Sequence, residues 1–242
     1  MKRRISAVLA ALLILITSVL PVWADGPGGS PEGTPLRIIF TGDIHDFFIT
    51  STQDVKGRVR EHGGAARMKW IIDQYRTENT IVADTGDFSM GTLLAHNFET
   101  EGSELRILGA MGYDVVTLGN HEFDFGAKAL SNMLTAAENS GDRIPAIIQS
   151  NMDFSGNLTE DQQLIKDHFD KQTIAKTGIV KVGNSGLNIG IIGLSGVDSV
   201  ECSPLSGQNW IDYKEAAKNA VDILKDSTDI IVCLSHAGTD GN

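Results

Sequence analysis

Four short apolar runs in this chain each end in side chains that can bind a metal ion. These side chains are Asp43, His45, Asp84, Asp87, Asn120, His121 and His236. In open α/β sheets, ligands bind at the carboxyl ends of the strands. A mixed set of oxygen and imidazole donors suits one or two divalent transition-metal ions. The sequence therefore predicts a metal site at one edge of a sheet.

The first two runs leave a choice between ligands and ordinary turn residues. Asp43 and His45 are two positions apart, so an extended backbone would point both side chains to the same side. Otherwise Asp43 stabilises a turn and His45 is a surface histidine. We prefer Asp87 to Asp84 as a ligand, because Asp84 is expected to lie within the strand. An Asx-turn is the structural alternative for this pair, whereas a carboxylate at Asp87 can bridge two cations through its two oxygens.

The third run ends in two neighbouring residues, whose side chains diverge. We therefore do not expect Asn120 and His121 to bind the same ion, which leaves His121 for the reacting group. Asp124 could orient this imidazole and raise its basicity. The structural alternatives are a turn residue for Asn120 and a helix-start histidine for His121. His236, at the end of a predicted buried strand, is ambiguous by itself.

Strand-like and helix-like segments alternate along the chain and place these residues in a fold. The expected strands cover residues 36–40, 80–83, 114–118, 145–150 and 230–234, and the expected helices cover 63–76, 103–111, 126–139 and 212–225. Residues 173–182 and 187–194 are expected to form a hairpin with a short polar turn. Strand–helix units followed by a hairpin predict an α/β sandwich with two mixed β-sheets flanked by helices.

The N-terminus has the pattern of an export signal. Residues 2–4 are basic, residues 5–20 are mainly apolar, and small residues precede a predicted cleavage site after Ala24. Residues 1–24 are therefore expected to be a signal peptide, with a retained membrane anchor as the alternative. The protein is expected to be secreted, periplasmic or held at the cell surface, with no stable membrane span once the signal is removed.

The remaining sequence is predicted to be a short linker and one domain. Residues 25–35 are rich in glycine and proline and predict a flexible linker, and residues 36–242 are enough for one domain. The formal net charge of −11 argues against nucleic acid or an anionic membrane as a partner. A phosphate substrate would need local positive charge, which bound cations could supply. Cys202 and Cys233 either form a disulfide or remain two separate thiols.

Taken together, four segments resemble the calcineurin-like metallophosphoesterase superfamily. They are residues 40–45, 84–87, 112–126 and 234–236. Within the superfamily, the chain is most similar in its motifs to the secreted bacterial 5′-nucleotidase and 2′,3′-cyclic-nucleotide phosphodiesterase family. The sequence Leu-Gly-Asn-His-Glu-Phe-Asp-Phe-Gly at residues 118–126 is especially specific to the nucleotidase branch. The resemblance extends from Leu36 to the end of the sequence.

The resemblance implies a phosphoesterase that uses two divalent metal ions on a nucleotide or another small phosphoester. Mn, Zn, Fe, Co and Ni all remain open as the metal. In this family pattern, Asp43 and His45 bind the first ion and Asp87 bridges both ions. Asn120 and His236 then bind the second ion.

The resemblance also implies a catalytic dyad of His121 and Asp124. The dyad would stabilise the transferring phosphoryl group or protonate the leaving alkoxide, while a metal-activated hydroxide attacks phosphorus in line. Family members carry a further Gly-His-x-His or Gly-His-x-Gln segment and a C-terminal domain that binds the base, and neither precedes Asn242. We therefore expect a C-terminally incomplete catalytic domain. The alternatives are an exported domain that binds metal or phosphate with little or no activity, and a purely structural domain.

Overall fold

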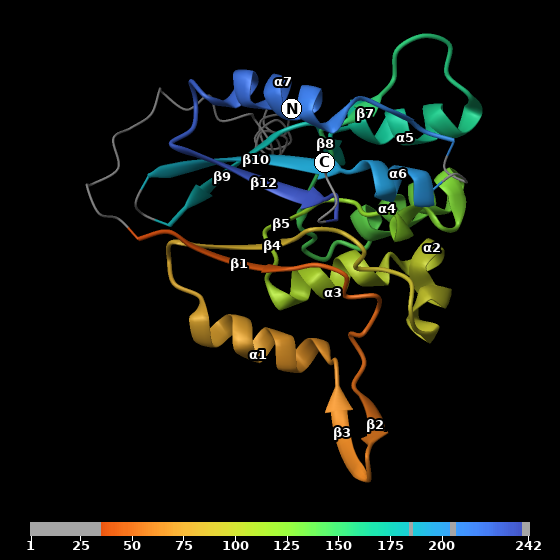
Figure 1. Cartoon of the computed structure of the whole chain (residues 1–242), viewed down its shortest axis with the longest axis vertical. Helices are drawn as coiled ribbons and strands as arrows, with labels where there is room; N and C mark the ends of the chain where they lie inside the picture. Colours follow the sequence, from red (N-terminus) through yellow and green to blue (C-terminus); the bar gives the residue numbers. More distant parts are fainter. Residues whose placement is uncertain (1–34, 184–185, 204–206, 239–242) are drawn as a thin grey trace, which may run out of the picture.

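A parallel sheet organises the first two-thirds of the chain. The computed structural model describes residues 35–183, 186–203 and 207–238 (Figure 1). The strand order in this sheet is β1 (Arg37–Thr41), β4 (Thr80–Asp84), β5 (Val115–Val116), β6 (Ala146–Ile148) and β8 (Ile174–Ala175). All its described pairs are parallel. Parallel neighbours need crossover connections, which here contain α1 (Ala65–Tyr75), α2 (Phe98–Glu101), α3 (Ser103–Met111), α4 (Gly126–Asn139) and α5 (Glu160–Asp170).

A smaller mixed sheet packs on the first. It is made of β9 (Gly178–Val182), β10 (Leu187–Ser195) and β12 (Ile230–His236), with β10 antiparallel to β9 and parallel to β12. The helix α7 (Tyr213–Leu224) covers its outer face, while α1 and α3 lie on the far side of the larger sheet (Figure 1). Side chains from both sheets meet in one apolar cluster: Ile81, Ala83, Val115, Ile148, Val182, Leu187, Ile189, Ile191 and Leu234.

The expected α/β sandwich is confirmed, with a difference in each sheet. Only the smaller sheet is mixed among the described strands, because each link between neighbours in the larger sheet includes a helical crossover. The run 173–182, expected to be one strand, is divided between the sheets: β8 joins the larger sheet and β9 the smaller one. The hairpin of β9 and β10 is confirmed, and its turn residues 184–185 lie outside the described residues.

Several elements carry no prediction from the sequence. They are the hairpin β2 (Ser51–Val55) and β3 (Arg58–His62), the helices α2, α5 and α6 (Val197–Cys202), the turns η1 (Leu93–Asn97) and η2 (His121–Phe123), and the short strands β7 (Met152–Asp153) and β11 (Asn209–Trp210). Cys202 is the last residue of α6. Cys202 and Cys233 are both free thiols, which agrees with the second of the two alternatives for this pair.

The predicted signal peptide at 1–24 and nearly all of the predicted linker at 25–35 lie outside the described residues. Within the part of the chain that the structure describes, no helix has both the length and the apolar composition needed to span a bilayer.

A charged brace fixes the start of β5, which leads into the candidate site. Asp114 accepts hydrogen bonds from Arg76 at 2.6 Å and from Arg143 at 2.9 Å. It also accepts one from the backbone N–H of Val82 in β4 at 2.9 Å, while Arg76 donates to the carbonyl of Gly112. Asp114 therefore ties the start of β5 to β4 and to the end of α1.

One histidine outside the site gives a pH-dependent contribution to stability. His168 in α5 is 2% exposed, and its Nε2 lies 2.9 Å from the hydroxyl of Ser131 in α4. Burial lowers the pKa of His168 below its usual value. The unfolded chain therefore binds this proton more readily, so the free energy of unfolding falls as the pH drops below about 6.5.

We predict that His168→Gln makes stability less dependent on pH between 7 and 5. Each unit of pKa difference between the folded and unfolded states contributes about 1.4 kcal/mol of this dependence. Urea unfolding of both proteins at pH 7, 6 and 5 measures the effect. The prediction would be contradicted if the free energy of unfolding fell by the same amount between pH 7 and pH 5 in both proteins.

Candidate metal centre

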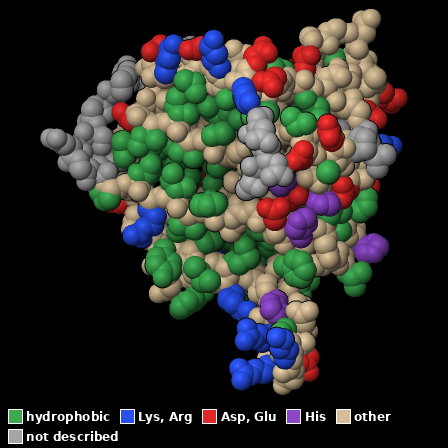
Figure 2. Space-filling model, viewed as in Figure 1, with side chains coloured by type: hydrophobic (Ala, Val, Ile, Leu, Met, Phe, Trp, Pro, Cys, Tyr) green, Lys and Arg blue, Asp and Glu red, His purple; other side chains and the backbone are tan. Residues whose placement is uncertain are grey.

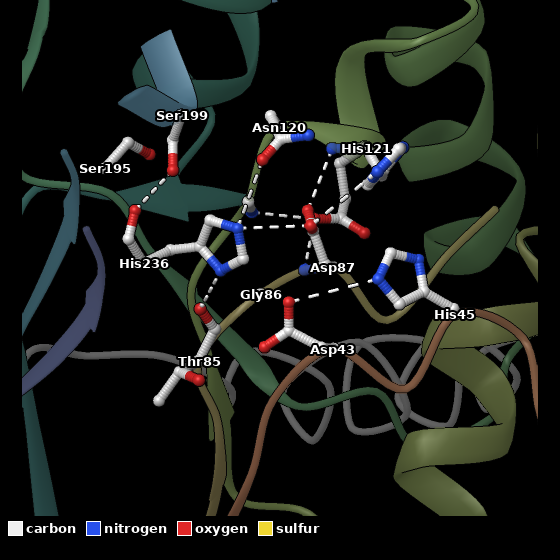
Figure 3. Close-up of polar contacts among 12 residues, drawn as sticks. Asp43, His45, Thr85, Gly86, Asp87, Asn120, His121, Ser195, Ser199 and His236 are labelled. Atoms are coloured by element: carbon white, nitrogen blue, oxygen red, sulfur yellow. Dashed lines mark hydrogen bonds and ion pairs between the residues drawn. The ribbon is translucent and has the colours of Figure 1, made fainter. Parts of the chain in front are cut away.

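The side chains singled out in the sequence meet at the carboxyl ends of β1, β4, β5 and β12 (Figure 3). The structure brings together Asp43, His45, Asp87, Asn120, His121, Asp124 and His236. Donor atoms of Asp43, Asp87 and His236 lie within 4.8 Å of one another, and so do donor atoms of His45, Asp87 and His121. Histidine and acidic side chains gather on one face of the surface (Figure 2).

Asp87 lies at the centre of this arrangement. Its Oδ2 is 3.2 Å from Nε2 of His236 and 4.0 Å from Nε2 of His121. Its Oδ1 accepts the backbone N–H of His121 at 2.9 Å. Burial raises the pKa of Asp87, but the contacts with His236 and His121 outweigh it, and the pKa lies below its usual value. Asp87 is therefore ionised, and Oδ2 is the oxygen that faces the other donors.

Two histidines are oriented in the way that metal-binding histidines usually are. Nδ1 of His236 lies 3.0 Å from the carbonyl of Thr85, and Nδ1 of His45 lies 2.9 Å from the carbonyl of Met90. A carbonyl only accepts, so each Nδ1 carries the proton and each Nε2 is available to a ligand. Histidines that bind metals commonly have the other ring nitrogen held by a backbone carbonyl in this way.

The contacts of Nε2 in His236 test whether a cation fits. This nitrogen faces Oδ2 of Asp87 at 3.2 Å and lies 3.2 Å from Oδ1 of Asn120. With Nδ1 already protonated, a proton or a cation is needed between these atoms. Burial lowers the pKa of His236, but the contact with Asp87 raises it more, to a net value above the usual one. Oxygen and nitrogen donors that converge around a required positive charge fit a divalent metal ion.

His121 points away from Asn120, as predicted from their adjacency (Figure 3). Nδ1 of His121 is 2.6 Å from Oδ2 of Asp124, and its ring lies edge-on to the ring of His45 at a centroid distance of 4.9 Å. Burial lowers the pKa of His121, but the hydrogen bond with Asp124 and the charge of Asp87 raise it above its usual value. A partly exposed imidazole is thus held beside the candidate ligands, and its protonated form is favoured.

The backbone around the site is left-handed at several residues that are not glycine. Asp43, His45 and Asp87 have φ values of 54°, 48° and 56°. The extended backbone expected at Asp43 and His45 is therefore wrong, since β1 ends at Thr41. Hydrogen bonds with the β4 loop position them instead, from the N–H of Asp43 to the carbonyl of Gly86 and from the N–H of His45 to that of Asp87, both 3.0 Å. Such backbone strain often accompanies functional sites.

Glu122 ties two of these loops together, and the sequence analysis missed it. Its buried carboxylate accepts the backbone N–H groups of Asp87, Ser89 and Gly119 at 3.0, 3.0 and 2.7 Å, and the hydroxyl of Ser89 at 2.7 Å. In the sequence, the only indication of its role was its position next to His121, in a segment already assigned to the site. Glu122 therefore fixes the β4 loop against the β5 loop.

Close backbone contact between these two loops requires glycine at position 119. A Cβ on Gly119 would lie 2.2 Å from Oδ1 of Asp87 and 2.6 Å from its backbone nitrogen. We predict that Gly119→Ala displaces Asp87, with a cost of about 1–3 kcal/mol in stability and a loss of Mn²⁺ binding in calorimetry.

A matched control is Gly156→Ala, which has left-handed backbone strain of about 1–2 kcal/mol but no atom within 4 Å of its Cβ. It should keep normal Mn²⁺ binding. Metal binding by Gly119→Ala equal to that of the control would contradict the predicted displacement.

Comparison with known proteins shows what the chain is similar to. The model for the calcineurin-like phosphoesterase family matches residues 36–242. An apyrase of Anopheles gambiae is 28% identical over 89% of this chain and 37% of its own length. A 2′,3′-cyclic-nucleotide 2′-phosphodiesterase/3′-nucleotidase of Haemophilus influenzae is 29% identical over 93% of this chain and 35% of its own length. The structure of a 5′-nucleotidase precursor from Thermus thermophilus aligns with a TM-score of 0.65 and 28% identity, over 84% of this chain and 37% of that one. The chain thus spans less than two-fifths of these relatives.

Proposed function

The chain belongs to the calcineurin-like phosphoesterase family, and from that premise we propose that it hydrolyses a phosphoester of a nucleotide with two divalent metal ions. The observation that carries the proposal is the position of Asp87, whose carboxylate belongs to both groups of converging donors. The names of the relatives support nucleotides as the substrate class. Two bound divalent ions would supply a nucleophile at neutral pH and neutralise charge on the phosphoryl oxygens.

The proposed ligands are divided between the ions as follows. Asp43 and His45 bind the first ion, Asn120 and His236 bind the second, and Asp87 binds both. His121 belongs to the same group of donor atoms as His45 and Asp87, and we leave it for the substrate. The fixed Nδ1–H groups of the two ligand histidines support this division, since they leave Nε2 facing Asp43 in one case and Asn120 in the other. Three protein ligands for each ion would leave room for water and substrate, as in many catalytic sites.

We assign proton donation to His121. Asp124 holds Nδ1, so the Nε2–H of the imidazolium is available to the leaving alkoxide oxygen. The hydrogen bond with Asp124 raises the pKa of His121, which favours the protonated donor form. Because the donor form exists below that pKa, turnover should decline as the pH rises through it. Proton transfer from a positioned side chain contributes roughly 10²–10⁴-fold to rate.

We further propose that residues 36–242 are the catalytic domain and that residues 1–24 direct export. The basic, apolar and small-residue pattern of the N-terminus supports the second part. Expression in a bacterial host should give protein outside the cytoplasm that begins at Asp25. N-terminal sequencing and intact-mass measurement check this, and protein that retains Met1 in the membrane fraction would instead indicate an anchor.

The activity is tested by phosphate release from AMP and p-nitrophenol release from bis(p-nitrophenyl) phosphate, with Mn²⁺, Zn²⁺ or EDTA. The proposal predicts turnover with metal and none with EDTA, and a preference between the substrates separates monoester from diester chemistry. Binding of metal without turnover of either compound would contradict the proposed hydrolysis. That result would support an exported metal-binding domain.

A further inference from the structure

A short helix holds the backbone of two of the proposed metal ligands. The first contact is at the carbonyl of His236, the last residue of β12. It accepts the hydroxyl of Ser199 in α6 at 2.6 Å and the N–H of Gly196, just before α6, at 3.0 Å. Figure 3 shows Ser199 beside the backbone of His236, on the side opposite Asp87.

The second contact lies at the other end of the same helix. Ser203 follows the last residue of α6, and its hydroxyl donates to the carbonyl of Asn120 at 3.1 Å. Ser199 and Ser203 are 7% and 6% exposed, so both side chains are buried. One element thus contacts the main chain of both Asn120 and His236, which are 116 positions apart.

The two serines join segments that carry proposed ligands of the same ion. His236 ends a strand whose only described partner is β10, with Ser195 as its last partner in register. Asn120 is held from a different loop, and its side-chain oxygen must remain near Nε2 of His236, now 3.2 Å away. Glu122 fixes Asp87 and the β5 loop that carries Asn120 against each other, and the serine contacts link this loop to the end of β12. Metal sites require donors held within about 0.5 Å of the productive geometry.

We propose that Ser199 and Ser203 are positioning residues that set the separation of Asn120 and His236 for the second metal ion. The inference rests on the proposed function, because it concerns the same site. Each serine holds a carbonyl of a ligand residue, so the side chain is fixed through its own main chain. Loss of either hydroxyl keeps every ligand side chain in the protein but lets Asn120 and His236 move relative to each other.

The test is Mn²⁺ binding by Ser199→Ala, Ser203→Ala and the double variant, measured by calorimetry and electron paramagnetic resonance. We expect a roughly 10–100-fold weaker affinity for one ion, the usual effect of losing a group that supports a ligand, and a weaker spin-coupled signal from paired ions. Affinity for the other ion should change less than about threefold. Ser199→Thr keeps a hydroxyl, so it should bind both ions with the affinity of the unaltered chain.

Ser227→Ala is the matched control, since Ser227 also donates its hydroxyl to a main-chain carbonyl, that of Leu224 at 3.2 Å, far from the site. It should leave both affinities unchanged. The melting temperature in EDTA should fall by similar amounts in Ser227→Ala and Ser199→Ala.

Three results would overturn the inference. If the unaltered chain binds two ions and the double variant binds them equally well, the positioning role is wrong but the proposed function is not affected. Equal weakening of both ions together with a large fall in metal-free melting temperature indicates a general structural role. An unaltered chain that binds no Mn²⁺ contradicts the proposed function and this inference with it.

Discussion

Asp87→Asn is expected to abolish metal-dependent phosphate release and to weaken Mn²⁺ binding more than any other single ligand change. The carboxylate belongs to both groups of converging donors, and its Oδ2 faces the imidazoles of His236 and His121. The amide of asparagine removes the negative charge that both ions would share. The loss of affinity should exceed the roughly 10–100-fold that follows removal of a group that only supports a ligand. Calorimetric titration with Mn²⁺ measures it directly.

The control for this change lies three residues earlier. Asp84 is buried in β4, where burial raises its pKa to about 8, and it accepts hydrogen bonds from Thr41 and Gly86. A mainly neutral carboxyl at pH 7 is closely matched by an amide, so Asp84→Asn should keep Mn²⁺ affinity within about threefold. Equal losses in the two variants would show that burial of a polar group, and not a ligand, accounts for the effect.

His121→Asn is expected to lower kcat by about 10²–10⁴-fold while it changes Mn²⁺ affinity far less than Asp87→Asn does. The reason is that His121 is proposed as a proton donor held by Asp124, whereas Asp87 is proposed as a ligand. The variant should also lose the decline of turnover that begins as the pH rises through the raised pKa of His121.

Calorimetry and pH profiles of kcat for both variants separate these roles. Equal losses of Mn²⁺ affinity in His121→Asn and Asp87→Asn would contradict the division between donor and ligand. An unchanged pH profile in His121→Asn would contradict its role in proton transfer, even if kcat falls.

Much of the fold follows from local signals in the sequence. The bounds of α3 and α4 agree with the predicted ranges because their apolar residues recur at helical spacing. Gly112, in a left-handed conformation, ends α3. The hairpin of β2 and β3 was missed because all its residues are exposed, so no alternation of apolar and polar residues marks it. For α5, a capping box between Thr159 and Gln162 was the available signal.

The site was predictable to the extent that its chemistry follows the ends of strands. Asp43, Asp87 and His236 were found because each follows or ends an apolar run, and the structure brings them together. Glu122 and Ser199 were not found, because they act on the main chain of residues distant in sequence. Their partners depend on how loops approach one another after folding, as for Ser199 and His236, 37 positions apart.

We propose that this chain assembles a two-ion site that hydrolyses phosphoesters. The most direct test measures bound Mn²⁺ per chain by equilibrium dialysis and phosphate release from AMP in the same samples, as the metal concentration is raised. We predict two ions per chain at saturation, with turnover that appears as the second ion binds and disappears with EDTA. Turnover that is unaffected by EDTA, or a chain that retains no Mn²⁺, would contradict it.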